Sequence, residues 1–235
     1  MGLDTPAFRN ELLAALPPDE LDQLRPALHP VTFVLRQVLH EVGSPMDDVF
    51  FPESGLVSLT ADTKDTGLVE VGMTGREGFV GTAVPLNAKA GAVHQAIVQV
   101  PGAGHRMRAP AFRDALAAMP ALRDLCLRYV QFVMVQTAQS AACNARHEMP
   151  ERLARWLLMS RDRLDSDDLP MTQEFLSYML GVRRAGVSVV ANALQSTGVI
   201  RLSRGHLTVL DRDGLKEEAC PCYEMIEDSR KSIMG

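Results

Sequence analysis

Positive charge gathers in one stretch of an otherwise acidic chain. The 36 residues from Phe175 to Leu210 contain no Asp or Glu, although the 235-residue chain has a formal net charge of −5. The stretch holds Arg183, Arg184, Arg201 and Arg204, together with His206. A guanidinium group binds phosphate or guanine through two parallel hydrogen bonds. The stretch therefore predicts a DNA-binding surface.

Two short helices and a hairpin follow one another here, as in a winged helix-turn-helix. Thr172 fits the N-cap of the first helix, and Gly181 ends that helix. Arg183 and Arg184 open the second helix, whose N-terminal residues meet base edges in such motifs. The predicted elements are helices Gln173–Leu180 and Arg183–Ser196 and strands Val199–Leu202 and His206–Leu210.

Apolar spacing predicts which sides of these helices face inward. The residues expected to lock the helices together are Leu176, Leu180, Val182, Val187 and Val190. Polar residues remain on the outward side and in the hairpin, and a solvated surface is the alternative interpretation. The predicted DNA-binding residues are Thr172, Arg183, Arg184, Ser188, Asn192, Arg201, Arg204 and His206.

The preceding part of the chain predicts a β-roll and a long helix. From Val31 to about Arg108, short apolar runs alternate with glycine-containing turns, which is typical of a small barrel or jelly roll. The runs predicted as strands include Val31–Leu35, Val49–Phe51, Leu56–Thr60, Leu68–Val71, Phe79–Val84 and Ala96–Val100. Residues 110–163 then become helical, with a break expected over 144–150. An a/d stripe on this helix favours either a homodimer interface or an ordinary buried helix, and the pattern does not choose between them. The stripe is Leu122, Leu125, Tyr129 and Phe132.

The predicted fold class is α+β, with three regions. Residues 1–117 form a jelly-roll-like effector domain, and residues 118–147 form the dimerisation helix and hinge. Residues 148–235 form the winged helix-turn-helix with a C-terminal tail.

In this order of domains, the chain resembles the bacterial Crp/Fnr superfamily of transcription regulators. The segment from Met171 to Val187, MTQEFLSYMLGVRRAGV, is similar to the helix-turn-helix signature of that family. The segment VFFPESGLVS, beginning at Val49, is similar to a strand–turn–strand common in its rolls.

The resemblance implies roles for single residues. Arg184 occupies the base-reading position, Thr172 and Arg183 match phosphate-contacting positions, and Arg204 and His206 lie in the wing. Ala185 and Val189 stand where the family often has an acidic residue and an arginine. The operator should therefore differ from that of the cyclic-AMP receptor.

The implied effector site departs further from the family pattern. Where cyclic-nucleotide-binding members have Gly-Glu and Arg-Ser or Arg-Thr pairs, this chain has Gly81-Thr82 and His94-Gln95. Thr82 cannot replace an ionised acceptor, and a neutral His94 is a poor phosphate clamp. We expect no tight cyclic-AMP binding, and these four residues remain candidates for lining a pocket for an unknown effector.

The cysteines predict neither a disulfide framework nor a metal site. Cys220-Pro221-Cys222 has no His or further Cys nearby in the sequence, and four ligands are usual for structural zinc. Cys126 and Cys143 are about 25 Å apart along one helix, so they cannot pair within the chain. We therefore expect no cofactor, and the sequence assigns no role to the four cysteines.

The sequence as a whole predicts a cytoplasmic, sequence-specific transcription regulator that binds a two-fold operator as a homodimer. Its expected partners are double-stranded DNA, a second copy of itself and RNA polymerase, with no membrane. We expect no cyclic-AMP gating. We also expect no catalysis, because the winged helix-turn-helix accounts for the residues after about 150 and leaves no catalytic domain. The alternative is an effector-binding or protein-interaction module whose helix-turn-helix no longer binds DNA.

Overall fold

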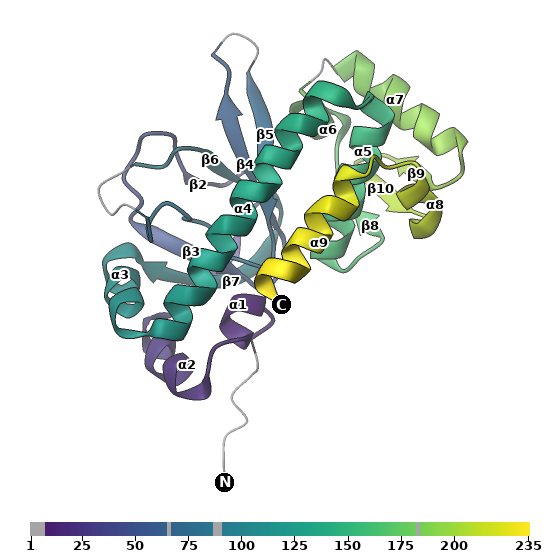
Figure 1. Ribbon diagram of the computed structural model, residues 1–235. Helices are drawn as coiled ribbons and strands as arrows, with labels where there is room; N and C mark the ends of the chain where they lie inside the picture. The colour runs from purple at the N-terminus through teal and green to yellow at the C-terminus, as the bar shows by residue number, and fades with distance from the viewer. Residues whose placement is uncertain (1–7, 65–66, 87–90, 182–183) are drawn as a thin grey trace. The chain divides into compact units, whose positions relative to one another are not determined.

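The computed structural model describes residues 8–64, 67–86, 91–181 and 184–235 (Figure 1). The chain divides into two compact units. The N-terminal unit comprises Met1–Val57 and Thr74–Val130, and the C-terminal unit comprises Ser58–Met73 and Gln131–Gly235. The mixture of strands and helices confirms the predicted α+β class. The division differs from the expected domains, because a hairpin segment and half of the long helix belong to the C-terminal unit.

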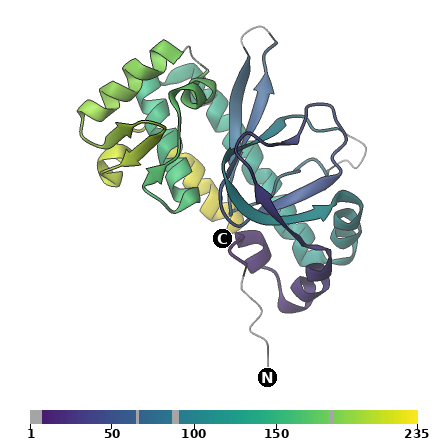
Figure 2. The ribbon, with the colours of Figure 1, turned by 180° about the vertical axis from the view of Figure 1, so that it is seen from behind.

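The predicted roll is confirmed as two small antiparallel sheets (Figure 2). One has the strand order β1-β7-β3, and the other has the order β2-β6-β4-β5. In the first sheet, β7 pairs with both neighbours, so that His29 lies opposite Arg106 and Asp48 opposite Arg108. The strands are β1 (His29–Phe33), β2 (Val38–His40), β3 (Asp48–Pro52), β4 (Leu56–Asp62), β5 (Leu68–Thr74), β6 (Gln95–Val100) and β7 (Gly102–Arg108).

Aromatic rings fill the core of the N-terminal unit. The Phe79 ring lies 5.9 Å from that of Phe51 and 5.6 Å from that of Phe112, measured between centroids. The Tyr129 ring is tilted against that of Phe79, with their centroids 5.4 Å apart. The Tyr129 hydroxyl donates a hydrogen bond to Thr74 Oγ1 over 3.0 Å. A Cβ at Gly78 would lie 1.8 Å from Cζ of Tyr129, so this close approach requires glycine.

Two features of the roll differ from the sequence prediction. The apolar run 79–84 is not a strand; only Val80 forms an isolated bridge, with Phe50, and turns follow. Gly81 there has a φ of +113°, which interrupts extended backbone. In contrast, β2 and β7 were not among the predicted apolar runs, because β2 has only three residues and the sequence of β7, GAGHRMR, lacks clear alternation.

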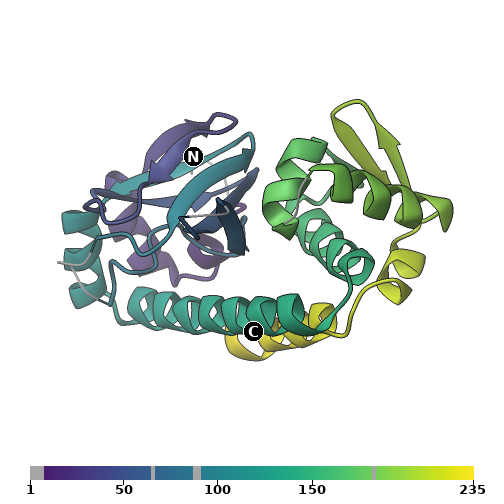
Figure 3. The same cartoon turned by 90° about the horizontal axis from the view of Figure 1, so that it is seen from above.

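The helical region consists of three helices, and its middle helix runs unbroken for 27 residues (Figure 3). Glu20 caps the start of this helix by accepting hydrogen bonds from the amides of Ala121 and Leu122. A capping box between Glu148 and Glu151 starts the next helix, so the break falls inside the predicted hinge. The helices are α3 (Ala109–Ala118), α4 (Pro120–Arg146) and α5 (Met149–Leu164).

The end of the chain forms the winged helix-turn-helix and a C-terminal helix. A three-stranded sheet of order β8-β10-β9 accompanies the helices. Within the described residues, no helix is both long and apolar enough to span a membrane. The remaining elements are α1 (Glu11–Ala14), α2 (Pro18–Leu24), η1 (Arg25–Ala27), β8 (Asp168–Leu169), α6 (Gln173–Leu180), α7 (Arg184–Ser196), β9 (Ile200–Ser203), β10 (His206–Val209), α8 (Arg212–Glu217) and α9 (Cys222–Met234).

Candidate nucleic-acid interface

The helix-turn-helix begins and turns at the residues that the sequence predicted. The Thr172 hydroxyl accepts a hydrogen bond from the amide of Phe175 over 3.2 Å, which confirms Thr172 as the N-cap of α6. Gly181 ends α6 with a φ of +65°, a conformation that glycine adopts without strain. The first helix has the predicted bounds, and the second begins at Arg184.

A shared apolar core holds the two helices against α5. Val187, Ala191 and Leu194 are buried on one side of α7, and Leu176 and Leu180 are buried on α6. On α5, the Trp156 ring lies 6.0 Å from that of Phe175. Full burial of one Val, Leu or Phe side chain contributes about 1.5–3 kcal/mol to the free energy of folding. This packing fixes which side of α7 faces outward.

The outward side of α7 has both polar and apolar character. Asn192 is exposed, Ser188 is half-buried, and Val189 is 70% exposed in the middle of the helix. An exposed Asn can bind adenine through two hydrogen bonds, and an apolar side chain can contact a thymine methyl group. Arg183 lies outside the described residues, as does the side chain of Arg184.

The predicted hairpin forms the wing. Its strands pair from Ser203 opposite His206 to Ile200 opposite Val209. Arg201 and Arg204 are exposed, and neither forms an ion pair within the described part of the chain. Two exposed guanidinium groups on one hairpin suit contact with a phosphate backbone.

The wing also carries a negative charge, at Asp168. Asp168 belongs to β8, which pairs with β10, because the neighbouring Leu169 is buried in the core. Its carboxylate lies 3.4 Å from His206 Nδ1, and both side chains are exposed. This carboxylate moderates the positive charge on one side of the wing.

The C-terminal unit also contains a buried polar pair, formed by Glu70 and Trp156. Trp156 Nε1 donates to Glu70 Oε1 over 2.7 Å. Burial raises the pKa of Glu70 to about 7, although hydrogen bonds from Ser58 and Trp156 and the charges of Arg155 and Arg163 oppose this shift. The strand that carries Glu70 contains the predicted apolar run Leu68–Val71, whereas the pairing of Glu70 with Trp156 was not predicted from the sequence.

The four effector candidates lie in the N-terminal unit, in turns and at the start of β6. Gly81 is packed closely, since an added Cβ would lie 2.9 Å from Cγ1 of Val49. Thr82 and His94 are half-buried, and burial lowers the pKa of His94. Gln95 donates its amide to the Glu41 carboxylate over 3.0 Å. A carboxylate beside Gln95 and a His94 that burial keeps neutral are unfavourable for a phosphate.

The structure corrects the dimer residues predicted on α4. Leu122, Leu125, Tyr129 and Phe132 are all buried within the single chain. An a/d stripe shows that a helix buries one side, but it does not identify what covers that side. Two other apolar residues on α4, Leu127 and Met134, are 44% and 67% exposed. They are seven positions apart, so both lie on one side of the helix.

Sequence reasoning also missed a cluster of potential ligands in the C-terminal unit. It treated Cys220 and Cys222 as a pair with no further ligand nearby, and the structure places Cys143 and His147 beside them. The signal in the sequence was the four-residue spacing of Cys143 and His147, which places both on one side of a helix.

Comparisons with known proteins agree with this architecture. Residues 151–218 match the family described as the Crp-like helix-turn-helix domain. No curated protein matches the chain in sequence.

Similar folds occur among solved structures. FixK2 from Bradyrhizobium japonicum is 15% identical, with a TM-score of 0.70 over 82% of this chain and 98% of its own. The c-di-GMP-responsive global regulator CLP from Xanthomonas campestris is also 15% identical, with a TM-score of 0.65 over 82% and 99%. A CRP/FNR-family transcriptional regulator from Thermus thermophilus is 21% identical, with a TM-score of 0.62 over 81% and 98%.

Proposed function

Because residues 151–218 match the Crp-like helix-turn-helix domain and the chain has the fold of the Crp/Fnr regulators, we propose that it is a transcription regulator that binds a two-fold DNA operator as a homodimer. The observation that carries this proposal is the outward side of α7 beside a wing with two exposed arginines. In a helix-turn-helix, the second helix enters the major groove and flanking positive groups bind phosphates.

The residues divide between two tasks in this proposal. α7 reads base edges, with Arg184 at its N-terminus, Asn192 further along the same helix, and Val189 available for a thymine methyl group. In the wing, Arg201 and Arg204 bind the phosphate backbone, which orients α7 but carries no sequence information. The absence of acidic residues from Phe175 to Leu210 limits the repulsion between this surface and DNA to charges from other segments, such as Asp168 on β8.

Dimerisation in this proposal uses the exposed side of α4. Leu127 and Met134 leave apolar surface in contact with water in a single chain, and a second copy would cover it. Two-fold symmetry then presents two α7 helices to two half-sites about one DNA turn apart.

We further propose that cyclic AMP does not gate this protein. Thr82 provides no charge for a ribose hydroxyl, and His94, whose pKa burial lowers, provides none for a phosphate. An effector of other chemistry would act by shifting the placement of the two reading helices. Nothing in the proposed mechanism requires catalysis.

The test is a selection of randomised duplex DNA by the purified chain, followed by anisotropy titration of the winning site. We expect a two-fold-symmetric site. The affinity should fall steeply with salt, because the logarithm of the binding constant decreases with the logarithm of the salt concentration by about 0.9 for each phosphate contacted. The variant Met134→Glu should weaken binding to the full site while leaving half-site affinity unchanged. If no site is enriched with or without nucleotide ligands, the alternative of a helix-turn-helix without DNA affinity replaces this proposal.

A further inference from the structure

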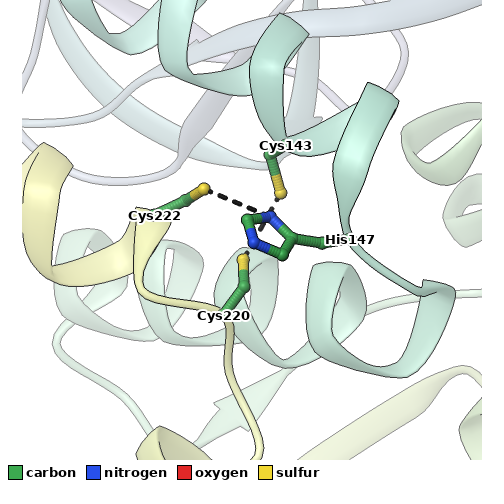
Figure 4. Close-up of side chains that lie close together, drawn as sticks. All are labelled: Cys143, His147, Cys220 and Cys222. Atoms are coloured by element: carbon green, nitrogen blue, oxygen red, sulfur yellow. Dashed lines mark hydrogen bonds between the residues drawn. The ribbon is translucent and has the colours of Figure 1, made fainter.

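Four potential metal ligands from two distant segments meet in the C-terminal unit (Figure 4). Cys143 lies in the last turn of α4 and His147 directly follows that helix, whereas Cys222 is the first residue of α9 and Cys220 lies just before it. Their three sulfur atoms and one imidazole nitrogen all lie within 4.8 Å of one another. About 70 residues separate the two segments, so only the fold brings these side chains together.

Each segment presents its two ligands by simple local geometry. Residues four apart on a helix lie on the same side, and the amide of His147 donates to Cys143 O over 3.0 Å, so the helical turn is complete. Cys220 and Cys222 flank Pro221, the N-cap of α9. The N-terminus of a helix favours negative charge, which suits the position of Cys222 to an anionic metal centre.

The distances suit a single tetrahedral ion. Cys143 Sγ lies 3.4 Å from Cys220 Sγ, and Cys222 Sγ lies 3.4 Å from His147 Nδ1. Around a tetrahedral zinc ion, with bonds of 2.0–2.3 Å, neighbouring ligand atoms are about 3.6–3.8 Å apart. Small shifts of the side chains would therefore accommodate the ion: the two pairs at 3.4 Å would move apart, and pairs nearer the 4.8 Å limit would move together. An iron–sulfur cluster holds its ligands further apart than one ion does.

The surroundings match a negatively charged metal centre. The three cysteines are buried, and three thiolates around a divalent ion leave a net negative charge. Arg155 and Arg152 both act electrostatically on Cys143. Their Nε atoms are buried and have no hydrogen-bond partner in the described part of the chain.

A further contact orients one of the sulfur ligands. Gln139 Nε2 donates to Cys222 Sγ over 3.0 Å. Side-chain donors of this kind fix the orientation of metal ligands and stabilise thiolates.

We propose that Cys143, His147, Cys220 and Cys222 bind one zinc-class divalent cation in a closed tetrahedral site. Three sulfurs and one imidazole form a ligand set found in structural zinc sites, and four protein ligands leave no open position for catalysis. The ion fastens α9 to the end of α4, directly before the break at Glu148 where α5 begins. Its effect is to hold the C-terminal helix in place within the unit that carries the helix-turn-helix.

The test is metal binding by the full-length reduced chain, reconstituted with zinc or cobalt(II) salts and desalted. We expect about one ion per chain by elemental analysis, and the visible absorption of tetrahedral cobalt–thiolate coordination. Cys222→Ser and His147→Ala should lower the affinity for zinc at least about tenfold, because losing a ligand costs no less than losing an outer hydrogen bond. Both variants should therefore retain less metal than the wild type after desalting. Cys126→Ala is the matched control, since Cys126 is a buried cysteine of α4 outside the cluster, and it should retain the full content.

The wild-type cobalt spectrum keeps the proposal testable if a variant fails to fold. No bound metal after reconstitution would overturn the proposal, as would equal metal content in Cys222→Ser. A disulfide between Cys143 and Cys220 in metal-free protein isolated without air would overturn it in favour of a redox pair. The inference does not rest on DNA binding, so either proposal can fail alone.

Discussion

The outward side of the C-terminal unit and its buried interior differ in how far apart along the sequence their residues lie. The proposed DNA-binding surface consists of α7 and the wing, which lie close together along the sequence. The interior contains two polar sites whose partners come from distant segments, namely the Glu70–Trp156 pair and the Cys–His cluster. Surface chemistry here follows from local sequence, whereas interior chemistry depends on which segments the fold brings together.

In the buried interior, the largest effect on stability is expected from the ionisation of Glu70. The folded carboxyl ionises near pH 7 and the unfolded one near 4.5, so the folded state binds the extra proton between these values. The free energy of unfolding should therefore fall as the pH rises from about 4.5 to 7, by up to about 3 kcal/mol. Glu70→Gln can still accept the Trp156 hydrogen bond but cannot ionise.

Chemical denaturation of both proteins at pH 5 and pH 8 measures this effect. Wild type should be less stable at pH 8 by the amount given above, and Glu70→Gln should lose that part of the pH dependence. An unchanged pH dependence in the variant would show that Glu70 is not the buried group that titrates.

The boundary between interior and outward side runs through α7. Val187 is fully buried and Val189, two residues on, is 70% exposed. Val187→Ala should lower the free energy of unfolding by about 1–3 kcal/mol, because it leaves a cavity. Val189→Ala should change it by less than about 0.5 kcal/mol.

DNA binding should respond in the opposite order. Val189→Ala should reduce the preference for one base pair per half-site, and Val187→Ala should leave preference unchanged in the folded fraction. Denaturation curves and titrations with single-base operator variants measure both quantities. Equal destabilisation by the two substitutions would place the boundary elsewhere.

The features of the fold that depend on neighbouring residues could be predicted from the sequence. Thr172, Gly181 and the hairpin turn are local signals whose partners lie within a few positions. The spacing of Leu122 and Tyr129 correctly indicated burial, but the covering surface was the chain itself. The proximity of Cys143 and Cys220 could not be predicted from the sequence, because the 77 positions between them contain several helices and strands.

The smallest effect is expected from the acidic group at the wing. Asp168 and His206 form an exposed pair, and such pairs contribute at most about 1 kcal/mol to stability. Asp168→Asn should leave the free energy of unfolding nearly unchanged. It should strengthen binding to all DNA sequences several-fold at low salt, because a negative charge beside the phosphates is removed. Anisotropy titrations at two salt concentrations measure the change, and weaker binding by the variant would contradict it.

The central claim is that α7 reads bases while the wing holds the backbone. The most direct test measures the affinities of Asn192→Ala and Arg204→Ala for the selected operator and its single-base variants across a salt series. Asn192→Ala should lose about 1–3 kcal/mol of discrimination at one base pair per half-site with an unchanged salt slope. Arg204→Ala should weaken binding to every sequence alike and reduce the slope by about 1 per subunit. If both variants keep wild-type discrimination and salt slope, this surface does not bind DNA and the account is wrong.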